Sequence, residues 1–211
     1  MKVIYAARFA LGACIVALLV TLIYARTGLR IVGVLLPRQA WLVENRAVWA
    51  ASWWLWLLVV FTWMVLLTAL MWHYLPGHRF NSMLQSGLMV IAATLTIGGI
   101  LVWMNVLPWA AGQTRANEFV ALVDTLAFTF LGSGFFMVGV VTAWIAFDLM
   151  RLASMPAWLP LPGLLAGLAF LPTPFLLPNP LPIAAGLVLW LVWCALLGLR
   201  KFMPNAYPEW K

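Results

Sequence analysis

The sequence predicts an all-α, polytopic membrane protein with six transmembrane helices in one bundle. Of its 211 residues, 66% are hydrophobic and only 8% are charged, whereas a typical soluble domain is about 25% charged. Apolar runs of about 20 residues, enough to cross roughly 30 Å of hydrocarbon, recur along the whole chain. A chain of this composition cannot cover its surface with polar groups, so we expect a single transmembrane domain over 1–211.

The apolar runs define the expected spans, and prolines and glycines mark where they are interrupted. The run 118–149 would be about 48 Å long as one helix, so it must tilt, protrude or bend at Gly132-Ser133-Gly134. We expect Pro108 to end the third span, and Pro172 and Pro174 to break the fifth. The six predicted spans are 9–25, 48–74, 83–106, 118–149, 157–177 and 181–199.

The segment 28–46, between spans 1 and 2, mixes apolar residues with charges. Pro37 is suited to the first turn of a short helix. A helix with both apolar and charged residues is typical of a segment that lies on a membrane surface. We therefore expect an interfacial segment here, with its charges facing water; these are Arg30, Arg38, Glu44 and Arg46.

The net charge of +7 comes from 12 Lys and Arg against 5 Asp and Glu. The basic residues are scattered between the spans, which favours membrane lipids as partners and not nucleic acid. Six spans place seven basic residues on the side of the termini and five on the other, so the positive-inside rule predicts a cell-membrane protein with cytoplasmic termini. We interpret the first run as an uncleaved span and not as a signal peptide.

Tryptophan is concentrated at the start of span 2, in the run WAASWWLWLLVVFTW at 49–63. At 100° per residue, four of these indoles share one helix face, and Trp54 and Trp72 lie on the other. Belt tryptophans sit at headgroup level, but Trp63 lies about 21 Å deeper than Trp49. The shared face either packs against the small residues of span 3 or lines a pocket for a lipid, isoprenoid or pigment. Its members are Trp49, Trp53, Trp56 and Trp63.

The middle of each predicted span is free of carboxylates, lysine and histidine, which weighs against proton or ion coupling. Asp124 and Asp148 are about 36 Å apart along a helix, so we expect them near opposite surfaces. His73 and His78 fall at or just past the end of span 2, without a metal-binding motif. The sequence therefore predicts no catalytic residue and no metal ligand, and it indicates no particular cofactor.

Polar residues gather where spans 2, 3 and 4 meet one membrane surface. They are either helix caps and rim ion pairs, with Asn45 and Glu118 at helix N-termini, or a polar mouth above an apolar pocket between spans 2, 3 and 4 that suits an amphiphile. Together with the tryptophan face they form the candidate ligand-binding set: Asn45, Arg46, Trp49, Trp53, Trp56, Trp63, Asn105, Arg115, Glu118 and Asp124.

The run NRAVWAASWWLWLL, followed by a glycine-bearing span 3 and a long span 4 with an acidic start, resembles a bacterial family of six-span membrane proteins with a domain of unknown function. The resemblance covers mainly the order of the spans and the Asn45-Arg46 entry to span 2. It implies a fold and no reaction.

We therefore expect a non-catalytic membrane protein that binds a lipid-like molecule or forms a subunit of a larger membrane assembly. One alternative is a small-molecule permease or the substrate-binding component of a vitamin importer, in which Ala13 and Ala17 form a small-residue face that docks a partner helix. Another is an intramembrane lipid-modifying enzyme, with Glu118 or Asp124 as acid or base.

Overall fold

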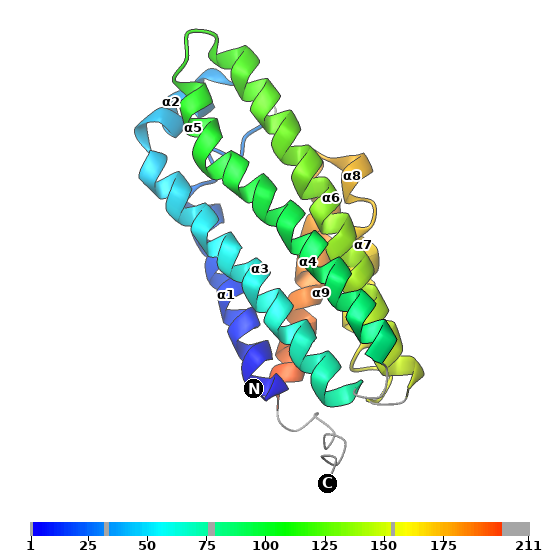
Figure 1. Ribbon diagram of the computed structural model, residues 1–211. Helices are drawn as coiled ribbons and strands as arrows, with labels where there is room; N and C mark the ends of the chain where they lie inside the picture. The colour runs from blue at the N-terminus through cyan, green and yellow to red at the C-terminus, as the bar shows by residue number, and fades with distance from the viewer. Residues whose placement is uncertain (1, 32–33, 76–78, 153–154, 200–211) are drawn as a thin grey trace.

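The computed structural model describes residues 2–31, 34–75, 79–152 and 155–199. Over these residues the chain is helical, and five helices are long and apolar enough to cross a membrane. They lie side by side in one bundle (Figure 1), which confirms the coarse prediction of a polytopic helical fold. The long helices are α1 (Val3–Tyr24), α3 (Arg46–Tyr74), α4 (Arg79–Leu101) with its continuation, α6 (Ala116–Arg151) and α9 (Leu181–Gly198).

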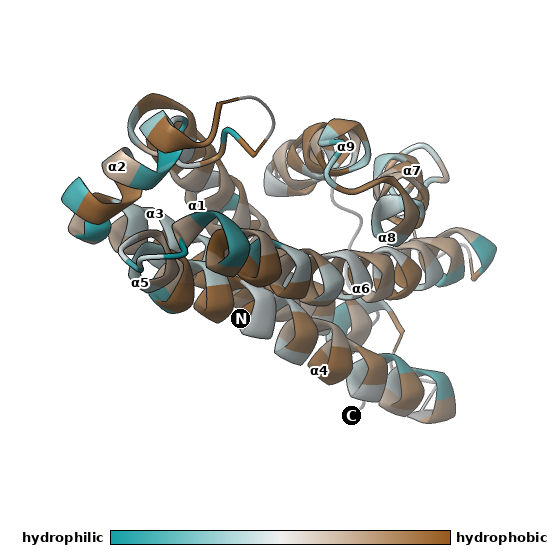
Figure 2. Cartoon of the chain, turned by 90° about the horizontal axis from the view of Figure 1, so that it is seen from above, coloured by the Kyte–Doolittle hydropathy of each residue, from teal (hydrophilic) through white to brown (hydrophobic). Residues whose placement is uncertain are grey.

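Shorter helices complete the bundle: α2 (Leu36–Glu44), the π-helix η1 (Val102–Val106), α5 (Leu107–Ala111), α7 (Leu161–Phe170) and α8 (Thr173–Leu176). Neighbouring helices close a ring in the order α1, α3, α4, α6, α7 and α9, and α9 packs back on α1. Viewed from above, α7 and α9 lie on one side of α6 and α4 lies on the other (Figure 2). We call the end with α2 and α5 the α2 end, and the opposite end the far end.

The larger apolar core lies inside this ring and includes one face of α1. Ala13 and Ala17 belong to that face and are buried in the chain's own core, because small residues let helices approach closely. The small-residue face predicted to dock a partner helix is therefore occupied by this chain, where α1 packs on α3 and α9.

The prediction that Pro108 ends the third span is wrong, because the helix continues through η1 and α5 to Ala111. A proline inside a helix deprives one carbonyl of its backbone donor. In a π-turn the carbonyl of residue i pairs with the N–H of residue i+5, and for Trp103 that residue is Pro108. The carbonyl of Trp103 instead accepts a hydrogen bond from Nε1 of Trp49 at 2.7 Å, which compensates for the missing donor.

The helix α6 runs unbroken through Gly132-Ser133-Gly134. Its glycines serve close packing: a Cβ at Gly132 would lie 3.1 Å from Cα of Pro174, and Gly134 lies against Thr96. The α7–α8 segment therefore meets α6 near its middle. As predicted, the fifth apolar run is broken at Pro172, between α7 and α8.

The segment predicted to lie on the membrane surface contains α2, with Pro37 in its first turn as expected. Its charges do not all face water, however. Arg38 and Gln39 are buried together with Leu42, and these three residues share one face of the helix because of their spacing. That face packs on the bundle, so α2 caps one end of the helices.

Candidate functional site

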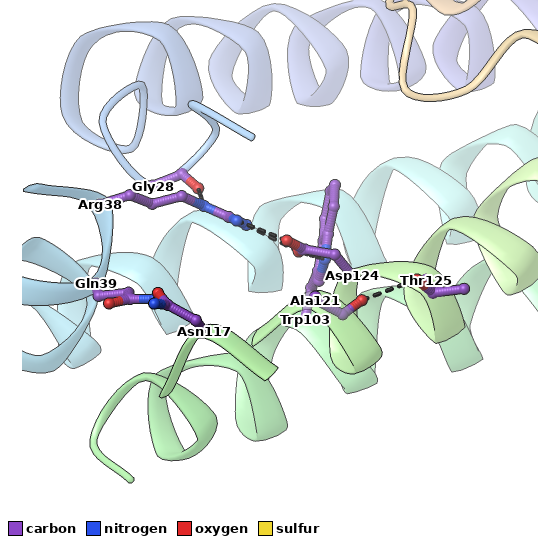
Figure 3. A network of polar contacts seen from close by, with 8 residues as sticks. All are labelled: Gly28, Arg38, Gln39, Trp103, Asn117, Ala121, Asp124 and Thr125. Atoms are coloured by element: carbon purple, nitrogen blue, oxygen red, sulfur yellow. Dashed lines mark hydrogen bonds and ion pairs between the residues drawn. The ribbon is translucent and has the colours of Figure 1, made fainter. Parts of the chain in front are cut away.

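A buried ion pair joins α2 to α6 at the α2 end. Arg38 Nη1 donates to Oδ2 of Asp124 at 2.6 Å, and Nη2 donates to Oδ1 at 2.8 Å (Figure 3). Arg38 is 1% exposed and Asp124 is 6% exposed. Taking both charges out of water costs on the order of several kcal/mol per ion. Only good geometry and further hydrogen bonds offset this cost. This bidentate pair has both.

The pair makes further hydrogen bonds to the surrounding helices. Arg38 Nε donates to the carbonyl of Gly28 at 2.7 Å, and Trp103 Nε1 donates to Oδ1 of Asp124 at 3.0 Å. A second link between α2 and α6 runs from Gln39 Nε2 to Oδ1 of Asn117 at 2.7 Å (Figure 3). The network therefore ties the α1–α2 connection, α2, η1 and α6 together.

Aromatic rings surround this network, and we call Trp41, Trp49, Trp53, Trp103 and Phe128 the tryptophan cluster. The ring centroids of Trp53 and Trp103 lie 5.0 Å apart, and those of Trp103 and Phe128 lie 5.2 Å apart. Trp49 is fully buried between Trp41 and Trp103. Tilted and edge-on rings add favourable contacts to the burial of their area, so the cluster supports the ion pair from one side.

On another side of Asp124 lies a hollow of about 220 Å³. One wall comes from the α1–α2 connection and the other from the first turns of α6. This part of α6 lies before Gly132, where α8 packs. The hollow is mainly apolar, with the carboxylate of Asp124 and the hydroxyl of Thr125 among its polar groups. Its described lining residues are Ile31, Leu35, Val120, Ala121, Asp124, Thr125 and Phe128.

Exposed tryptophans indicate how deep Asp124 lies. Trp54 is 63% exposed and Trp72 is 79% exposed, and the 18 residues between them span about 27 Å, close to one hydrocarbon thickness. Such rings favour the two membrane surfaces. Trp103 contacts both Trp53 and Asp124, so Asp124 lies near the level of Trp54. Its side chain is buried in the bundle.

The other polar residues of the candidate set do not converge on a pocket. Asn45 does not cap α3, because its Nδ2 donates to the Trp41 carbonyl, and Asn105 donates to the Leu101 carbonyl in its own helix. Arg46 Nη2 reaches the carbonyl of Pro108 at 3.4 Å. Arg115 and Glu118 lie 3.9 Å apart with exposed side chains. The Arg115–Glu118 contact is a rim pair of the predicted kind, whereas the predicted side-chain cap by Asn45 is absent. Of the set, only Asp124 is among the described residues that line the hollow.

The predicted tryptophan face is largely buried, and its N–H groups reach different helices. Trp56 Nε1 donates to Thr21 Oγ1 in α1 at 2.8 Å, and Trp63 Nε1 donates to Thr142 Oγ1 in α6 at 3.0 Å. The buried Nε1 of Trp53 has no hydrogen-bond partner among the described residues. The described lining of the hollow does not include these indoles, which favours packing over the predicted aromatic wall.

Sequence reasoning missed Arg38, which we expected on the membrane surface, and Trp103. A signal was available in both partner helices. Arg38 lies four residues before Leu42, on the apolar face of α2, and Asp124 lies between Val120 and Ala127 on the apolar face of α6. A charge on each of two apolar faces indicates a buried pair.

A second buried carboxylate lies toward the far end. Asp148 accepts a hydrogen bond from Gln85 Nε2 at 2.8 Å, and Oε1 of Gln85 is buried without a partner among the described residues. Within the described part of the chain, no three His, Cys, Asp or Glu side chains are grouped to hold a metal ion. His73 lies in the last turn of α3, and His78 lies outside the described residues.

No family model, curated protein or solved structure matches this chain. The resemblance to a bacterial six-span family therefore stays a prediction.

Proposed function

We propose that this protein is a six-span, non-catalytic protein of the cell membrane that binds an amphiphilic lipid in the hollow beside Asp124. The observation that carries the proposal is the hollow itself. Its described lining is mainly apolar and includes Asp124 and Thr125, which suits a molecule with one polar group and an apolar body.

The sixth crossing in this proposal is the α7–α8 segment. Gly139 packs on Gly167 and Gly132 packs on Pro174, so α7–α8 runs antiparallel to α6 and rises from the far end. The helix α9 then returns, and Arg8 Nε donates to the carbonyl of Gly198 at 2.9 Å. The start of α1 and the end of α9 therefore lie on one side, which fits an even number of crossings, and the basic residues favour the cytoplasm for that side.

The position of the hollow supports a lipid over a water-soluble ligand. Asp124 lies near the level of the exposed Trp54, where headgroups meet acyl chains. Ligand sites usually enclose about 300–1,000 Å³, so a hollow of about 220 Å³ accommodates a polar head and the adjoining part of a chain. The rest of the molecule would remain in the bilayer.

The contacts of the acidic residues favour binding over acid–base catalysis. Both oxygens of Asp124 accept hydrogen bonds from Arg38, and Trp103 also donates to Oδ1. Glu118 is exposed beside Arg115. A general acid or base must reach the proton that it transfers. The observed contacts hold Asp124 in place as a fixed acceptor.

The test is lipid retention after purification in mild detergent, measured by native mass spectrometry. Leu35→Trp and Ala121→Leu each add bulk at the hollow and leave Arg38 and Asp124 unchanged. Leu84→Trp is the matched control, because Leu84 is exposed on α4 and does not line the hollow. We expect the wild type and Leu84→Trp to retain a lipid that both hollow variants lose. Equal retention in all four proteins would refute the proposal, and a retained water-soluble vitamin would favour the importer component.

A further inference from the structure

We infer that the ligand of the hollow is a neutral lipid whose polar head is a hydroxyl group, as in a diacylglycerol, and that this hydroxyl donates a hydrogen bond to Oδ2 of Asp124. This inference rests on the proposed lipid-binding function. It narrows that function to one chemical class.

Asp124 accepts three hydrogen bonds from the described residues. An ionised carboxylate offers about four lone-pair sites. Oδ1 accepts from Arg38 Nη2 and from Trp103 Nε1, and Oδ2 accepts from Arg38 Nη1. One acceptor site, on Oδ2, is left for a ligand.

Thr125 is the other polar side chain of the described lining. Its hydroxyl donates to the carbonyl of Ala121 at 2.8 Å (Figure 3), so its oxygen is left as an acceptor. Asp124 and Thr125 thus both offer acceptors to the hollow. A matching ligand must bring a donor.

The charge of the lipid headgroup also decides whether it suits the hollow. Arg38 already balances the charge of Asp124 at 2.6 Å, so a cationic headgroup would lose its hydration without gaining an unpaired partner. A phosphate would place a second anion beside the carboxylate, and the described lining contains no Lys or Arg to pair with it. An uncharged donor avoids both costs, and a hydroxyl is the simplest one that a lipid carries.

The experiment measures binding of defined lipids to the full chain in mild detergent by native mass spectrometry. The probes share two oleoyl chains and differ in the head: dioleoylglycerol, its 3-O-methyl ether, dioleoyl phosphatidylglycerol and a dioleoyl trimethylammonium lipid. The methyl ether is the matched control, because it keeps the oxygen and loses the donor. A hydrogen bond to a charged acceptor contributes about 1.5–3 kcal/mol, so we expect dioleoylglycerol to bind at least about tenfold more tightly than the ether.

Leu35→Trp and Ala121→Leu separate the inference from the proposed function. If dioleoylglycerol is preferred and both variants abolish that preference, the inference is supported. Suppose instead that dioleoylglycerol and its methyl ether bind equally, or that a charged lipid binds best, while the variants still reduce binding. The assignment of a hydroxyl headgroup is then wrong, and lipid binding in the hollow stands. If the variants change the binding of none of the probes, both proposals fail.

Discussion

Asp124 and Asp148 lie near opposite ends of α6, and the bundle accommodates the two buried carboxylates differently. Asp124 is held by a bidentate arginine and an indole, whereas Asp148 accepts from the neutral amide of Gln85. The arginine comes from α2, so neutralising Asp124 also fixes that helix to the bundle. Gln85 lies in α4, which already packs along α6. The Arg38–Asp124 pair therefore adds a helix to the bundle, while the Gln85–Asp148 hydrogen bond joins two helices that pack together anyway.

The largest difference between the two ends is expected from removing the partner of each carboxylate. Arg38→Met leaves a buried, uncompensated charge and should lower the free energy of unfolding by about 3–5 kcal/mol. Gln85→Leu removes a neutral donor and should cost about 1–3 kcal/mol. Unfolding in mixed detergent micelles measures both values. Equal losses would show that the ends do not differ in this way.

A glycine lies toward each end of the bundle, and alanine at the two positions should change the stability in opposite directions. At Gly28 a Cβ would lie 2.5 Å from Cζ3 of Trp49, which is fully buried, and 2.9 Å from Cζ3 of Trp41. Gly28→Ala should therefore destabilise the protein by up to about 3 kcal/mol through overpacking. Gly87, in α4 toward the far end, has no atom within 4 Å of such a Cβ, so Gly87→Ala should stabilise it by up to about 1 kcal/mol. Thermal unfolding of the two variants gives the sign of each change in stability. A Gly28→Ala protein as stable as the wild type would contradict the packing at Trp49.

Within the tryptophan cluster, the indole of Trp49 should matter more than that of Trp53. Trp49→Phe removes the donor to the Trp103 carbonyl, which Pro108 leaves without a backbone partner, and should cost about 1–2 kcal/mol. Trp53→Phe is the control because its buried N–H has no partner among the described residues, so a smaller loss is expected. Urea unfolding in micelles compares the two, and a greater loss for Trp53→Phe would contradict the role of Trp49 at η1.

The smallest effect is expected from the deep indole in the larger core. Trp63 Nε1 donates to Thr142 Oγ1. Without this donor, the Thr142 hydroxyl can still form a hydrogen bond by donating to a carbonyl of its own helix. Trp63→Phe should therefore cost less hydrogen-bond energy than Trp49→Phe, whose acceptor is a fixed backbone carbonyl. Paired unfolding curves check the order of the two variants.

The sequence predicted well those features that depend on local composition. Five long apolar helices, the break at Pro172, and the exposed Trp54 opposite the buried Trp49 follow from apolar length, proline chemistry and helical spacing. Features that depend on long-range contacts were not predicted. The helix passes Pro108 because an indole of α3 replaces the missing donor, and sequence spacing does not show that Trp49 and Trp103 meet.

The candidate site shows the same limit. Asp124 was selected, and its height near one end follows from helical rise. Its partner Arg38 was assigned to the membrane surface because surface charges usually face water. The contact spans 86 residues of sequence, so only the packing of α2 on α6 reveals the pair. The hollow likewise forms between the α1–α2 connection and α6, not between the predicted spans 2, 3 and 4.

A double-mutant cycle on Arg38 and Asp124 tests the buried pair most directly. Arg38→Met and Asp124→Leu should each lower the free energy of unfolding by about 3–5 kcal/mol, because each leaves one charge alone. The double variant should regain most of that loss, since two apolar side chains replace a buried pair at little cost. Losses that simply add in the double variant would contradict the account.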